Sequence, residues 1–179
     1  MNKKQKGFSL IELLIVVAII LIIAAIAIPN LLRAKIAANQ SAAVGTLRTM
    51  SSAEETFSST YSDGFTLSLA QLGGAAGAAV TCKAAGLVDE VLSKDPATKS
   101  GYTFTYVANG TPALTAGIPV ACGASGDTGF TVSAGPTTLS TGTAAYCIDE
   151  TGVIRVDSGA TAGEVIPAPC STSKFPPLQ

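Results

Sequence analysis

The chain has 179 residues, of which 47% are apolar, and its 11 basic and 12 acidic residues give a formal net charge of −1. This length suits one compact domain with an additional segment, and the balanced charge excludes a basic surface that would neutralise nucleic-acid phosphates. The absence of histidine excludes catalytic sites that pair serine or cysteine with histidine, and metal sites with histidine ligands. We expect no catalytic residues, no metal, no cofactor and no nucleic acid as main partner.

The first seven residues form a basic leader. Three lysines lie within residues 1–7, and the next basic residue is Arg33. Loss of this leader would reduce the eleven basic residues to eight, against twelve acidic ones. Because lysine-rich flanks stay on the cytoplasmic side of a membrane, we expect the leader in the cytoplasm and the chain after Ile28 outside.

Residues 8–28 form an apolar run, FSLIELLIVVAIILIIAAIAI, in which Glu12 is the only charged side chain. As a helix, this run is about 30 Å long, which matches the hydrocarbon layer of a bilayer. Three interpretations are a permanent membrane anchor, an ordinary signal peptide, and a leader followed by a helix that later leaves the membrane. The signal peptide is disfavoured, because a cut after Ala27 places Pro29 second in the mature chain and the run carries a carboxylate.

The pattern stays helical over residues 29–60. Apolar side chains recur there at spacings of three, four or seven among mostly small and polar residues, and so form one stripe. The stripe consists of Val44, Leu47, Met50, Phe57 and Tyr61. We expect one helix from Phe8 to about Ser59, about 75–80 Å long. A bend is expected at Pro29, because proline lacks a backbone N–H and crowds the carbonyl of Ala25.

Residues 61–179 are expected to form a globular head that ends in a proline-rich tail from Pro167 onward. Alternating side chains predict strands at residues 102–107, 130–134, 144–148 and 153–156, the last two joined by a turn over 149–152. A short helix is expected at 87–93, before Asp95-Pro96. The predicted fold is α+β, with the apolar face of a small antiparallel sheet packed on the stripe of the long helix.

Four cysteines lie between residues 82 and 170 without any C-x-x-C spacing, which disfavours a zinc or thioredoxin-like site. Two disulfides are expected instead, and they require an oxidising compartment outside the cytoplasm. Of the three possible pairings, we favour Cys147 with Cys170 and Cys82 with Cys122.

Glu12 lies in the apolar run, four residues from Phe8. An ionised acid in hydrocarbon costs about 2.5–3.5 kcal/mol on insertion scales, so a partner is expected, although an anchor that tolerates the acid is the alternative. A cut between Gly7 and Phe8 would turn a neutral amide into a cationic amine. The amine and the carboxylate can pair within one chain or between two copies. Between copies, the pair would determine register, because a misplaced copy leaves both charges unpaired.

The segment KKQKGFSLIELLIVVAIILIIAAIAIPN, residues 3–30, resembles the processing and assembly segment of type IV pilins and of the pseudopilins of type II secretion. The resemblance implies that Gly7 precedes the prepilin peptidase cut and that Phe8 becomes the N-methylated mature terminus. It also implies that Glu12 recruits and aligns subunits.

The function implied by this resemblance is that of a structural subunit of a type IV pilus-like filament. The partners would be prepilin peptidase, an assembly platform in the inner membrane, and further copies of the chain. The precursor would lie in the inner membrane, and the processed filament would be periplasmic or extracellular. Two alternatives stay open: a major pseudopilin of a type II secretion system, and a soluble exported domain with an ordinary cleaved signal peptide.

Overall fold

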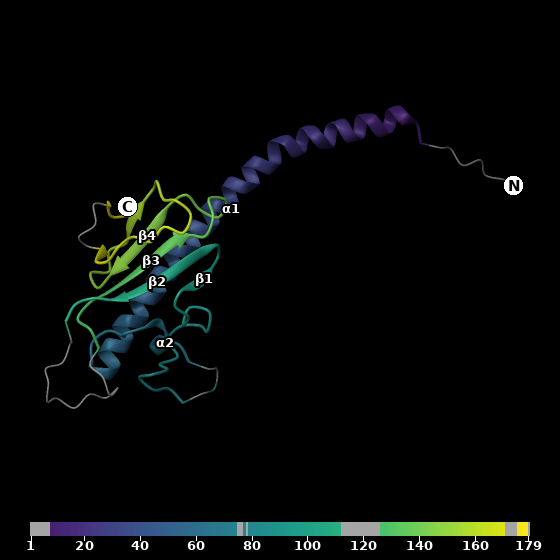
Figure 1. The fold of residues 1–179 in the computed structure, drawn as a ribbon. Helices are drawn as coiled ribbons and strands as arrows, with labels where there is room; N and C mark the ends of the chain where they lie inside the picture. The colour runs from purple at the N-terminus through teal and green to yellow at the C-terminus, as the bar shows by residue number, and fades with distance from the viewer. Residues whose placement is uncertain (1–7, 75–76, 78, 112–125, 171–174, 179) are drawn as a thin grey trace. The chain divides into compact units, whose positions relative to one another are not determined.

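The structure, a computed structural model, describes the chain except for residues 1–7, 75–76, 78, 112–125, 171–174 and 179. The chain divides into two compact units, Met1–Lys35 and Ile36–Gln179. The helix α1, Leu10–Tyr61, contributes to both units (Figure 1). Its bounds confirm the predicted long N-terminal helix.

In the first unit, α1 is apolar on all sides. The large apolar side chains exposed between Phe8 and Leu32 are each at least 45% exposed. Within the part of the chain that the structure describes, α1 is the one helix whose length and composition would allow it to cross a bilayer. Pro29 lies inside α1 without ending it, and the side chain of Asn30 donates a hydrogen bond to the carbonyl of Ile26 at 3.0 Å. The bend at Pro29 stays a prediction.

The second unit contains an antiparallel sheet of five strands, in which each strand pairs with the next one along the chain. The strands are β1 Ala97–Lys99, β2 Tyr102–Ala108, β3 Phe130–Pro136, β4 Ala145–Asp149 and β5 Arg155–Asp157. The four predicted strands correspond to β2 through β5, and β4 pairs with β5 as expected. The predicted α+β architecture of a long apolar helix and a small antiparallel sheet is confirmed.

The main core lies between α1 and one face of this sheet (Figure 1). From the predicted stripe, Leu47, Met50 and Phe57 are buried, and the other two members pack against the core partly buried. The opposing sheet residues alternate along each strand, as the period of two in a strand requires. They are Phe104, Tyr106, Val132, Ala134, Tyr146 and Ile148. The short helix α2, Leu69–Leu72, adds two buried leucines.

Over β3 and β4, the other face of the sheet is covered by the C-terminal part of the chain. A second, smaller core there comprises Ala145, Cys147, Ala160, Ile166 and Cys170. The proline-rich tail is part of the sheet edge, because the N–H of Val156 donates to the carbonyl of Pro176 at 3.0 Å and the N–H of Leu178 donates to the carbonyl of Ile154 at 2.7 Å. The central strands β3 and β4 are therefore buried on both faces.

The short helix expected at residues 87–93 is wrong, because this segment forms turns. The N–H groups of Leu87 and Val88 donate to the carbonyl of Leu72, and the N–H of Leu92 donates to the carboxylate of Asp89. One i to i−4 bond is present, from the N–H of Ser93 to the carbonyl of Asp89 at 3.1 Å, but a single turn does not make a helix, and the Asp89 side chain competes for the neighbouring N–H of Leu92.

Candidate functional site

Ser9 and Glu12 form a capping contact at the start of α1. The carbonyl of Ser9 accepts the first hydrogen bond of the helix, from the N–H of Leu13 at 3.3 Å, so Ser9 is the residue that caps the helix. The carboxylate of Glu12, three residues later, accepts a hydrogen bond from the N–H of Ser9 at 2.9 Å. This is half of the S-x-x-E capping box. It places the acid beside the helix N-terminus, where the macrodipole favours negative charge.

Only one oxygen of Glu12 is used in this way. Among the described residues, its other carboxylate oxygen has no hydrogen-bond partner. Phe8 and Leu10, on either side of Ser9, are 81% and 80% exposed. The site therefore combines a carboxylate at the helix N-terminus with an apolar surface that water does not favour.

The predicted disulfide between Cys147 and Cys170 is present, with the two Cα atoms 5.9 Å apart. It connects β4 to the C-terminal segment inside the second core. Gly7 and Cys122 lie outside the described residues. The leader cut and the pairing of Cys82 with Cys122 therefore stay predictions.

A buried carboxylate that the sequence analysis did not single out lies in the head. Glu54 of α1 is 0% exposed and accepts two hydrogen bonds from Thr66, from its N–H at 2.9 Å and from its hydroxyl at 2.5 Å. The hydroxyl of Tyr106 donates to the carbonyl of Thr66 at 2.6 Å. Burial raises the pKa of Glu54, and the bonds from Thr66 partly counteract this. Burial likewise raises the pKa of Tyr106.

This cluster joins the helix, the loop after it and the sheet. Its sequence signal was available, because Glu54 lies four residues after Met50 and three before Phe57, on the apolar stripe. All of its described partners are protein groups that satisfy the carboxylate. These bonds stabilise the head, and the exposed carboxylate of Glu12, in the apolar part of α1, is the better candidate for function.

Comparison with known proteins defines the class. Residues 2–28 match the family model of the prokaryotic N-terminal methylation motif. This match contains the basic leader, Glu12 and the apolar run. The chain therefore carries the segment typical of precursors that are cut and methylated at the start of an apolar helix.

Two curated relatives narrow the class further. The chain is 48% identical over 65 residues to the type IV major pilin protein PilA of Myxococcus xanthus. This aligned segment covers 35% of this chain and 30% of that protein. The chain is also 65% identical over 37 residues to the type IV wide pilus major component PilA4 of Thermus thermophilus, which covers 21% of this chain and 28% of that protein. The chain thus spans less than a third of the length of these curated relatives. No solved structure matches it. The motif and the two relatives support a place in the type IV pilin family.

Proposed function

We propose that the chain is the structural subunit of a type IV pilus-like filament and that it has no catalytic role. The observation that carries the proposal is the position of the Glu12 carboxylate, the one acid in an exposed apolar stretch, at the start of α1. The methylation motif over residues 2–28 and the pilin relatives support the same function.

In this proposal, prepilin peptidase hydrolyses the bond between Gly7 and Phe8. The new amine of Phe8, which is then N-methylated, is cationic and lies four residues from Glu12. Before the cut, the N–H of Phe8 belongs to a neutral peptide bond and gives the carboxylate no counter-charge. Cleavage therefore creates the partner that the acid needs in an apolar environment.

The apolar part of α1 then exchanges one set of apolar contacts for another. In the precursor, it lies in the inner membrane, where lipid tails cover its exposed side chains. In the filament, the same side chains pack against the helices of neighbouring copies, with the help of an assembly platform in the inner membrane. Packing between apolar helices alone distinguishes poorly between different axial positions of neighbouring copies. The pair of amine and carboxylate therefore fixes the axial shift between one copy and the next.

The test compares Glu12→Gln with Glu12→Ala. Glutamine keeps a side-chain oxygen that can accept from the N–H of Ser9, but it removes the negative charge, whereas alanine removes both. We expect both variants to be exported and cut at Phe8, and neither to yield filaments when cells are sheared. Normal filament yield from the glutamine variant alone would refute the role of the charge, and normal filament yield from both variants would refute the role of the residue.

A further inference from the structure

The outward side of α1 in the second unit carries two opposite charges. Over Ile36–Tyr61, the charged residues are Arg48, Glu54 and Glu55. Glu54 is buried, whereas Arg48 and Glu55 are exposed. Among the residues that the structure describes, neither of these two has a hydrogen bond or an ion pair to another side chain. Both charges are therefore available to a partner molecule.

The spacing of the two charges makes the face complementary to a shifted copy of itself. Seven residues separate Arg48 from Glu55. On an α-helix this is almost two full turns, so the two side chains lie on the same side, about 20° apart around the axis and about 10.5 Å apart along it. A parallel copy displaced by about 10.5 Å brings the arginine of one chain level with the glutamate of the other.

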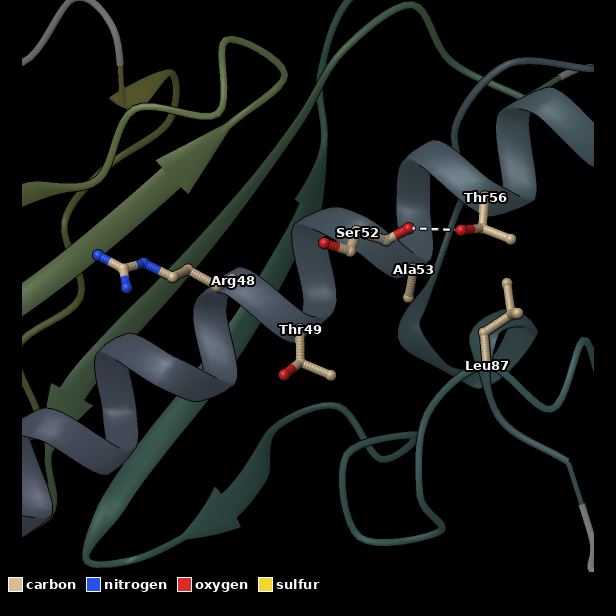
Figure 2. Close-up of a pocket in the computed structure, with 6 residues that line it drawn as sticks. All are labelled: Arg48, Thr49, Ser52, Ala53, Thr56 and Leu87. Atoms are coloured by element: carbon tan, nitrogen blue, oxygen red, sulfur yellow. Dashed lines mark hydrogen bonds between the residues drawn. The ribbon is translucent and has the colours of Figure 1, made fainter.

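The surface around Arg48 has room for a neighbour. An open hollow of about 410 Å³ lies on one side, lined by residues of α1 from Arg48 to Thr56 and by Leu87 (Figure 2). A second hollow of about 450 Å³ extends from Arg48 toward Ala37 and reaches Leu178. Gly45 lines the second hollow, and a Cβ added there would meet no atom within 4 Å. The space beside these turns of α1 is therefore open, with Leu87, Tyr146 and Leu178 of the head at its borders.

We propose that this face of α1 binds a second copy of the same chain, with Arg48 of one copy paired to Glu55 of the next. The proposal rests on the proposed function as a filament subunit and assigns a second register contact at the level of the heads. The occupant is another copy because one face supplies both charges, and a copy that lies beside the first, shifted by about 10.5 Å along the axis, brings the two charges level. In such a pair of copies, one copy still has its Glu55 unpaired and the other its Arg48. Each of these can pair with a further copy, so the contact repeats along an open fibre.

Charge reversal tests the pair. Arg48→Glu and Glu55→Arg each place like charges opposite one another, and each should lower the yield of sheared filaments by about tenfold or more, because like-charge contacts are strongly disfavoured. The double variant Arg48→Glu/Glu55→Arg restores opposite charges and should recover a near-normal yield. High salt should partly relieve each single defect. Lys94→Glu, at an exposed position of the head outside α1, changes the net charge as Arg48→Glu does and should leave the yield unchanged.

Each outcome decides the question. Near-normal yield from both single variants overturns the pair, and so does failure of the double variant to recover filaments while its head melts at the wild-type temperature. Melting of each variant is measured in parallel, and because both positions are exposed the melting temperatures should match. Failure of the proposed function gives a different result, since the wild-type chain would then form no filaments under the same conditions.

Discussion

Replacement of the buried Glu54 by alanine is expected to destabilise the head strongly. The change removes the acceptor for two donors of Thr66, its N–H at 2.9 Å and its hydroxyl at 2.5 Å, in a place where neither donor can reach water. A buried donor without a partner costs about 1–3 kcal/mol, and the lost side chain also leaves a cavity. Because the variant no longer has to bury a carboxylate, the net loss should be about 3 kcal/mol.

The assay is thermal unfolding of the full chain in detergent micelles, followed by the near-ultraviolet circular dichroism of the head tyrosines. For a chain of this size, a loss of about 3 kcal/mol lowers the melting temperature by roughly 10 °C. Glu55→Ala is the matched control, because it removes the neighbouring exposed acid and should change stability by no more than about 0.5 kcal/mol. If Glu54→Ala melts within about 2 °C of Glu55→Ala, the hydrogen bonds to Thr66 do not stabilise the head as argued.

Further changes test other parts of the fold. Burial raises the folded-state pKa of Glu54 above its usual 4.5, so the stabilising contribution of the protonated acid is fully present below pH 4.5 and is lost as the pH rises through the raised pKa. Glu54→Gln should remove this pH dependence from the free energy of unfolding measured in urea. If the variant keeps the pH dependence of the wild type, Glu54 is not the group that causes it. Replacing Cys147 and Cys170 together by serine opens a 23-residue span and should cost about 3 kcal/mol, measured as the shift between wild-type and variant denaturation midpoints. Gly135→Ala would place a Cβ 1.8 Å from a backbone carbonyl oxygen of the C-terminal segment that covers β3, and should lower the free energy of unfolding by about 1–3 kcal/mol or more. Gly45→Ala is the control, because its Cβ would meet no atom within 4 Å. Equal melting temperatures of the two variants would refute the close approach at Gly135.

The long helix and the central strands could be predicted because their signals are local. Side chains at helical spacing mark the buried stripe of α1, and alternation marks β2 and β3. The expected disulfide between Cys147 and Cys170 joins strand β4 to a segment that covers it. In these cases, the residues that carry the signal also make the contacts.

Other features depend on contacts between distant segments. The strand β1 has three residues, Ala97–Lys99, and forms by pairing with β2, so its sequence alone gives no strand signal. The residues that follow Leu87 have the apolar spacing of a short helix, but in the structure the backbone N–H groups of Leu87 and Val88 donate to the carbonyl of Leu72. The tail pairs with β5 through a carbonyl of proline, which can accept although proline cannot donate.

Glu54 illustrates a different cause. A charged residue in a polar stretch is normally predicted to be exposed. The charge of Glu54 therefore outweighs its helical spacing in such a prediction, although that spacing places it on the apolar stripe. Burial becomes possible because Thr66, twelve residues later, supplies both a backbone and a side-chain donor. At the N-terminus, in contrast, Ser9 and Glu12 stand three residues apart and the capping contact is local.

The most direct measurement is the mass of the mature chain recovered from sheared filaments, with fragmentation of its N-terminal peptide. The proposed function predicts a chain that begins at Phe8 and is heavier by one methyl group on its amine. A chain that retains residues 1–7, or one that begins at Ile28, would contradict it, because the amine beside Glu12 would then never form.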